Sequence, residues 1–208
     1  MSRYTISGLL AFIESGNLDD AERLLETTLK AFADEINVPN KSYISVANRS
    51  ELEAFKKEHP AENVVWLDSA FGEALHGKTF IAVARRDFRV ALRRSDRELQ
   101  FRPYAADAFI ERAVILIQLR RPAEALEAYR TAAHLAERFS SNVNYRATAM
   151  RGIGWTQVEL GDFNSARKAI ESSLEIEADN KIALGELEYI AHMEQQRIPL
   201  CRELKHQQ

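Results

Sequence analysis

Gly72-Glu-Ala-Leu-His-Gly77-Lys78-Thr79 is the segment of this chain whose spacing most closely matches a chemical motif. It satisfies the pattern G-x-x-x-x-G-K-[ST], in which backbone amides wrap phosphates and the lysine reaches them. A functional loop of this kind follows a buried strand and opens a helix. Val64-Val-Trp-Leu67 could imitate the strand, but four residues separate it from Gly72, and no later apolar strand ends in an aspartate for magnesium. We therefore rank nucleotide binding third among the possible functions.

Two other patterns could indicate catalysis or metal binding. Glu73-Ala-Leu-His76 matches the Glu-x-x-His ligand pair of di-iron bundles. Such sites need a second pair on a facing helix, and Glu188 and His192 are four residues apart instead of three. Cys201, the only cysteine, has no evident base beside it to activate a nucleophile. We expect no metal, no cofactor and no catalytic residue, and hence that the protein is not an enzyme.

The composition is that of an ordinary globular chain. The 208 residues are 46% hydrophobic and 28% charged, which allows a sizeable core in one domain or two small ones. A net charge of −3 argues against binding of polyanions over the whole surface. No stretch approaches the roughly 18 apolar residues of a membrane span, and the N-terminus lacks the charged region of a secretion signal. We expect a cytoplasmic protein without membrane contact.

A repeated helical pattern must position any site that the chain has. A small alanine recurs where the two helices of a hairpin would cross, and a helix begins three residues before it. Ala125 and Ala166 lie seven residues further apart than Ala91 and Ala125 do. The seven extra residues amount to about two helical turns. They can extend the helices around residues 137–144 without turning the apolar face away. The copies are Arg85-Arg-Asp-Phe-Arg-Val-Ala-Leu92, Leu119-Arg-Arg-Pro-Ala-Glu-Ala-Leu-Glu-Ala-Tyr129 and Leu160-Gly-Asp-Phe-Asn-Ser-Ala-Arg-Lys-Ala-Ile170.

The pattern resembles the tetratricopeptide repeat (TPR) family, whose period of about 34 residues is also the distance from Ala91 to Ala125. The resemblance covers roughly residues 68–197 and is closest in the third copy, which has Gly154, Leu160 and Gly161. It implies an all-α fold, a right-handed superhelix of antiparallel helical hairpins with a C-terminal capping helix. It also implies a protein that holds other molecules and does not transform them.

The resemblance predicts three hairpins followed by one capping helix. We expect hairpins at about 68–101, 105–138 and 143–176, with the capping helix over about 180–196 and Pro199 ending it. The predicted organisation is an N-terminal helical region over 1–60, a TPR-like domain over 61–198 and a C-terminal tail over 199–208.

The N-terminal region matches the pattern only weakly. Residues 5–34 read as a helical hairpin with Ala21 at the crossing position, so they form a possible divergent repeat. Tyr43-Ile-Ser-Val is compatible with a short strand or an extended connector, and we interpret it as a connector. A helix over about 50–58 should follow, and then a long helix from Val64 to about Arg86.

In TPR folds the first helix of each hairpin lines the concave surface, and equivalent positions form rows. Alignment on the alanines predicts an apolar stripe, which commonly marks a binding surface. It would suit an amphipathic helix or an extended apolar segment of a protein or peptide, held by a scaffold or adaptor. Filling of this groove by the chain's own N-terminal region or tail is an equally open alternative. The groove residues are His76, Phe80, Val83, Ile110, Val114, Ile117, Arg151, Trp155 and Val158, with Glu73, Asp107 and Thr148 on one rim and Ala84, Gln118 and Glu159 on the other.

Some TPR proteins hold the acidic C-termini of chaperones with a clamp of Lys, Asn and Arg side chains. The corresponding positions here cannot grip two carboxylates, so this class of partner is disfavoured. These positions are His76, Phe80, Glu111, Thr148 and Gly152.

An arginine-rich helix face supports a second hypothesis. Arg86, Arg89, Arg93 and Arg97 share one side of a helix, and a positive stripe could hold nucleic acid or an acidic partner in a regulator. No aromatic residues interleave with these arginines, so nucleic acid is disfavoured. We favour a solvated face whose arginines pair with acids such as Glu124 and Glu127. A homodimer through terminal hairpins is also possible.

Overall fold

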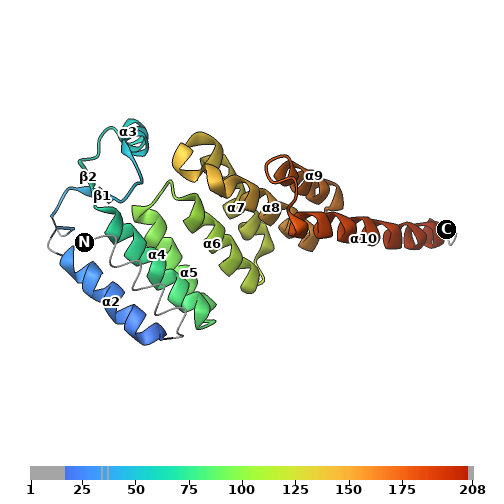
Figure 1. Cartoon of the computed structure of the whole chain (residues 1–208), viewed down its shortest axis with the longest axis horizontal. Helices are drawn as coiled ribbons and strands as arrows, with labels where there is room; N and C mark the ends of the chain where they lie inside the picture. The colour runs from blue at the N-terminus through green and yellow to red at the C-terminus, as the bar shows by residue number, and fades with distance from the viewer. Residues whose placement is uncertain (1–16, 34, 37, 206–208) are drawn as a thin grey trace.

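The computed structural model describes residues 17–33, 35–36 and 38–205, with side chains up to Gln195. Helical hairpins stack side by side in a superhelix, as the sequence pattern predicts (Figure 1). Each second helix contacts the first helix of the hairpin that follows. Within the described part of the chain, no helix is both long enough and apolar enough to cross a membrane.

The three predicted hairpins are confirmed. Each first helix turns into its second through a residue in the left-handed region, Arg86 (φ 59°), Arg120 (φ 60°) or Gly161 (φ 80°). The three crossing alanines are completely buried, as their small size requires. The helices are α4 (Ser69–Ala84) and α5 (Phe88–Phe101), α6 (Ala106–Gln118) and α7 (Pro122–Arg138), and α8 (Arg146–Glu159) and α9 (Phe163–Leu174).

The seven extra residues of the second repeat lie near the predicted place. Helix α7 has 17 residues, whereas α5 has 14. A 3₁₀ helix, η1 (Ser140–Tyr145), then fills the connection to α8. The insertion therefore builds an additional turn beside the longer helix.

Helix α2 (Leu18–Ala31) stacks against α4 as the second helix of a preceding hairpin would. Its Ala21 and Leu25 are buried together with Ala74 and Ile81, which agrees with Ala21 as a crossing residue. The predicted first arm of that hairpin, up to residue 16, lies outside the described residues.

Residues 42–66 differ from the expectation, because they form a small β-α-β unit. Strands β1 (Ser42–Ile44) and β2 (Val64–Trp66) pair in parallel, with Ser42 opposite Val64, and α3 (Arg49–Glu58) connects them. The connector interpretation is thus wrong for residues 42–44. The long helix from Val64 is also wrong, because β-branched and aromatic side chains favour the strand and Asp68 caps α4 at the amide of Ala70.

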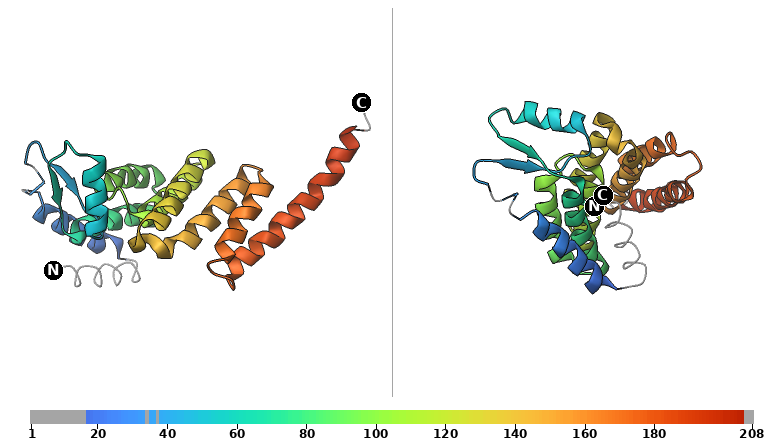
Figure 2. Two further views of the ribbon diagram at one scale, coloured as in Figure 1. Left: turned by 90° about the horizontal axis from the view of Figure 1, so that it is seen from above. Right: turned by 60° about the vertical axis from the view of Figure 1, so that its left-hand side comes forward.

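The β-α-β unit packs on the connections between hairpins. Ile44, Leu52 and Phe55 join the main core, in which the Tyr104 and Phe139 rings lie 4.9 Å apart. Figure 2 shows this unit beside α4 and the long helix α10 (Lys181–Lys205) at the opposite end. The predicted helix end at Pro199 is wrong, because α10 continues to Lys205. A proline inside a helix removes one backbone hydrogen bond and crowds the carbonyl four residues earlier, which disfavours the helix without preventing it.

Two glycines, one in α8 and one in α10, allow a matched test of the packing. A Cβ atom at Gly152 would lie 2.3 Å from Cε1 of the buried Tyr129 ring, whereas one at Gly185 would meet nothing within 4 Å. We expect Gly152→Ala to lower the free energy of unfolding by about 1–3 kcal/mol through overpacking. Gly185→Ala should raise it by up to about 1 kcal/mol through helix propensity. Urea unfolding of both variants measures this, and equal effects would contradict the packing of α7 against α8.

Candidate functional site

The nine predicted groove residues all lie on the first helices α4, α6 and α8. We call the surface of these helices the first-helix face. Phe80 and Trp155 protrude most, with 38% and 37% of their surface exposed. Val114, Ile110 and Ile117 are half-buried against the main core, and Val83 packs beside Ala82 and Ala91. Phe80 and Trp155 are therefore more exposed than the smaller apolar side chains of this set.

The two basic residues of this set are held by neighbouring acids. His76 Nδ1 lies 2.9 Å from Glu98 Oε1. Arg151 Nη1 lies 2.6 Å from Glu177 Oε2, and its Nη2 donates to Thr148 Oγ1 at 3.1 Å. The charge of each of these two side chains is therefore partly offset by a neighbouring acid.

Glu98 lies at the centre of a buried charged network. Its carboxylate is completely buried and accepts hydrogen bonds from Thr79 Oγ1 at 3.0 Å and Arg102 Nη1 at 2.5 Å. Arg102 Nη2 also donates to both oxygens of Asp107, at 2.9 and 3.1 Å. Full pairing of buried charges is needed to offset the cost of removing them from water. The network therefore links α4, α5 and the start of α6.

Burial and pairing act in opposite directions on the pKa values of this network. Burial disfavours the His76 imidazolium, but the hydrogen bond and the charge of Glu98 outweigh it and raise the His76 pKa. Burial also opposes ionisation of Asp107, yet the Arg102 guanidinium lowers its pKa. The predominant state is an ionised Asp107 that holds Arg102 in place.

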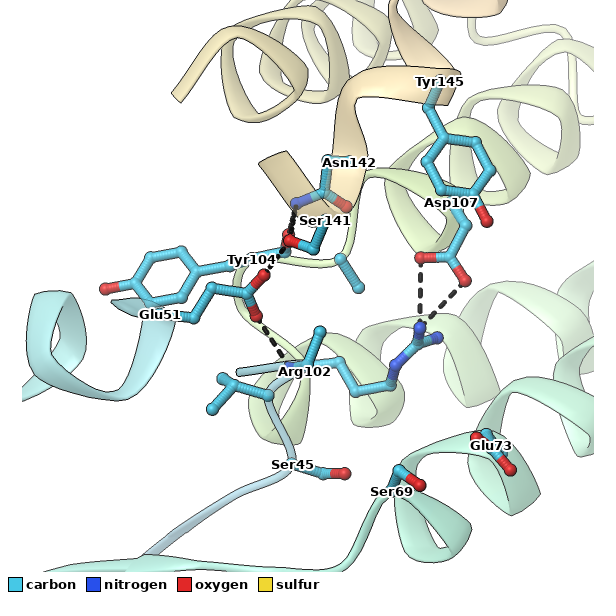
Figure 3. Close-up of a pocket in the computed structure, with 13 residues that line it drawn as sticks. Ser45, Glu51, Ser69, Glu73, Arg102, Tyr104, Asp107, Ser141, Asn142 and Tyr145 are labelled. Carbon is cyan, nitrogen blue, oxygen red and sulfur yellow. Dashed lines mark hydrogen bonds and ion pairs between the residues drawn. The ribbon is translucent and has the colours of Figure 1, made fainter. Parts of the chain in front are cut away.

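A polar pocket of about 220 Å³ lies at the edge of the first-helix face, between the β-α-β unit, η1 and the starts of α4 and α6 (Figure 3). Glu51 supports its wall by accepting from the Ala47 amide at 2.9 Å and from Ser141 Oγ. Asn142 bridges the Tyr104 carbonyl, at 2.8 Å, and the Ala106 amide, at 3.1 Å. Glu73, a predicted rim residue, also lines the pocket. The wall was missed from the sequence because it depends on contacts between distant segments.

The four predicted residues of the arginine face, Arg86, Arg89, Arg93 and Arg97, are exposed and take part in no ion pair with another described residue. The expected pairing with Glu124 and Glu127 is wrong. Both acids bind arginines in their own helical turns, Arg121 at 2.5 Å and Arg130 at 2.6 Å. The neighbouring Arg85 and Arg94 instead pair with Glu22 on α2.

Gly72 to Thr79 lie within helix α4, as the repeat alignment predicts. The amides of a continuous helix bond to carbonyls one turn away and cannot wrap a phosphate. Lys78 pairs with Glu26 at 3.0 Å, and Thr79 belongs to the buried network. Among the residues with described positions, no three His, Cys, Asp or Glu side chains are grouped so that they could hold a metal ion.

The pH dependence of stability tests the role of His76. Because its pKa is raised in the folded state, the protonated ring stabilises the fold below its ordinary pKa of 6.5, and this contribution disappears as the pH rises through the raised value. We expect His76→Gln to lower the free energy of unfolding by about 1 kcal/mol in acid and by less in alkali. Urea unfolding across this pH range measures the difference. The exposed His134 is the control, and a pH-independent effect at His76 would contradict the network.

The comparisons with known proteins agree with the helical-repeat fold described above. Residues 104–177 match the tetratricopeptide repeat family. No curated protein sequence matches significantly. The first TPR of Spaghetti (RPAP3), bound to an HSP90 peptide, is 22% identical, with a TM-score of 0.54 over 61% of this chain and 95% of that chain. PilF of Pseudomonas aeruginosa is 14% identical, with a TM-score of 0.64 over 96% of this chain and 71% of that one.

The MamA protein is also 14% identical, with a TM-score of 0.62 over 97% of this chain and 87% of its own. At these identities the structural likeness establishes the fold. The family match covers the second and third hairpins, and the structural likeness extends over nearly the whole chain. The chain therefore carries tetratricopeptide repeats, assembled in a TPR-type helical superhelix.

Proposed function

We propose that the chain is a non-catalytic scaffold that holds a protein or peptide partner in an apolar groove on the first-helix face. The protruding Phe80 and Trp155 are the observation that carries this proposal. They occupy equivalent register positions on α4 and α8, with Val114 of α6 between them in the repeat order. Exposed aromatic side chains in a row are typical anchoring points for a partner.

The energetics favour several anchors acting together. Burial of one large apolar side chain contributes roughly 1.5–3 kcal/mol. Micromolar affinity corresponds to about 8 kcal/mol, in addition to the cost of association. The partner would therefore cover Phe80, Trp155 and the valine and isoleucine side chains of the groove. An amphipathic helix or an extended apolar segment has the shape for this task.

The bound peptide in the Spaghetti structure, SRMEEVD, is acidic, and an acidic tail is disfavoured as a partner here. Of the clamp positions, His76 is bonded to Glu98, and Glu111 is itself a carboxylate. Phe80, Thr148 and Gly152 complete the set and bring no positive charge. A carboxylate-rich tail would thus meet repulsion at Glu111, and the one cation among the clamp positions, His76, is already paired with Glu98.

Charge placed in the groove should abolish partner binding. We expect Phe80→Glu/Trp155→Glu to lose at least about tenfold in affinity, because the anchors would have to bury carboxylates. Affinity purification from the source cell with quantitative mass spectrometry compares this variant with wild type. The control is Val143→Glu on η1, where 55% of the residue is already exposed.

An unchanged set of partners in the folded double variant would contradict a groove function. A double variant that does not fold, as judged by circular dichroism, would show that the chain fills the groove itself. Loss of the partner from the double variant alone is the expected result.

A second candidate function uses the arginine face on α5. Its four side chains are exposed without an ion-pair partner among the described residues, which leaves their charge available to an acidic protein or a nucleic acid. The scaffold proposal ranks first, because no aromatic side chain interleaves with these arginines to stack on bases.

Salt dependence tests this second candidate. If the arginine face binds, affinity for a single-stranded DNA oligonucleotide or a polyglutamate peptide should fall steeply with salt. Arg89→Gln/Arg93→Gln/Arg97→Gln should reduce both the affinity and the slope. Arg23→Gln/Arg49→Gln/Arg130→Gln, which removes the same charge from exposed positions elsewhere, should not. Fluorescence anisotropy measures the binding, and its absence at low salt would eliminate this function.

A further inference from the structure

Helix α10 repeats the register of the first helices. Two buried positions of α4, α6 and α8 recur in α10, one repeat length after their equivalents in α8, and there they are completely buried. One row is Ala74, Ala108, Ala149 and Ala183, and the other is Ile81, Ile115, Thr156 and Ile190, all with 2% or less of their surface exposed. Helix α10 thus packs on its neighbours as a first helix does, at the C-terminal end of the stack (Figure 1).

The same register carries the exposed row onto α10. Tyr189 follows Trp155 by one repeat length and is 49% exposed, and Ile182 of the same helix is 71% exposed. Phe80, Trp155 and Tyr189 therefore occupy equivalent positions on α4, α8 and α10.

The charges of the extended face are asymmetric. His76, Arg102 and Arg151 all pair with internal acids. By contrast, Glu111 and Glu186 form no ion pair or side-chain hydrogen bond with another described residue, although both are partly buried. Burial raises the pKa of both carboxyl groups, and at Glu111 the charge of His76 offsets this effect only in part.

We propose that α10 is a fourth helix of the groove and that the groove takes a partner segment bearing lysine or arginine side chains. This inference rests on the proposed scaffold function and specifies the chemistry of its partner. The exposed rings of Trp155 and Tyr189 offer faces for cation–π contact. The carboxylates of Glu111 and Glu186 offer charge-assisted hydrogen bonds to the same cations. An acidic segment would be repelled by these two carboxylates.

A random peptide library displayed on phage, panned on the full chain, tests the inference without knowledge of the natural partner. Peptides are kept when binding is lost in Trp155→Ser and retained in Val143→Ser. We expect this groove-dependent set to be enriched in lysine and arginine and depleted in aspartate and glutamate. Glu111→Gln/Glu186→Gln should weaken the selected peptides by about tenfold, and Tyr189→Ser should weaken them as well.

The control variant is Glu171→Gln/Glu175→Gln, which removes the same charge from exposed positions around the end of α9. It should change affinity by less than about twofold, because distant exposed charges are screened. Groove-dependent peptides without basic enrichment, or equal weakening by both glutamine pairs, would overturn the inference while the scaffold function stands. Failure to recover any Trp155-dependent peptide would overturn both.

Discussion

The close approach of paired helices at small side chains is the constraint on which the rest of the structure depends. Ala91, Ala125 and Ala166 are completely buried at the helix crossings, and no larger side chain would fit without moving the helices apart. Their recurrence sets the register of every hairpin. That register decides which residues of α4, α6 and α8 enter the core and which remain on the first-helix face. The exposed row of Phe80 and Trp155 is thus a consequence of how the alanines are spaced.

Polar interactions then fix one edge of this face. Glu98, Arg102 and Asp107 connect α5 to α6 through buried ion pairs, which are specific in direction, and His76 and Thr79 connect α4 to Glu98. Asn142 attaches η1 to the start of α6, and Glu51 attaches the β-α-β unit to η1. These contacts form the wall of the polar pocket at the edge of the first-helix face. Its cations are used in holding that wall, which leaves the unpaired charge of the first-helix face negative.

The hairpins could be predicted from the sequence because their signals are local and repeated. The β-α-β unit could not, since its short strands pair across the whole of α3 and its flanking loops, and Val64-Val-Trp suits a strand or a helix. The partners of Glu98 were hidden for a similar reason, because His76 and Thr79 approach it from another helix. The register of Tyr189 was accessible, since its distance from Trp155 is the repeat length. The exposed row was not extended to Tyr189 in the sequence analysis, because this helix was treated only as a cap.

Site-specific photo-crosslinking in the source cell tests most directly whether the first-helix face is the working surface. The photoreactive residue p-benzoylphenylalanine would replace Trp155 in one variant and Val143 in another, since both positions are exposed and only Trp155 lies on the first-helix face. The account predicts a covalent adduct with a partner protein at position 155 and none at position 143. Adducts at position 143 alone, or equal adducts at both positions, would contradict it.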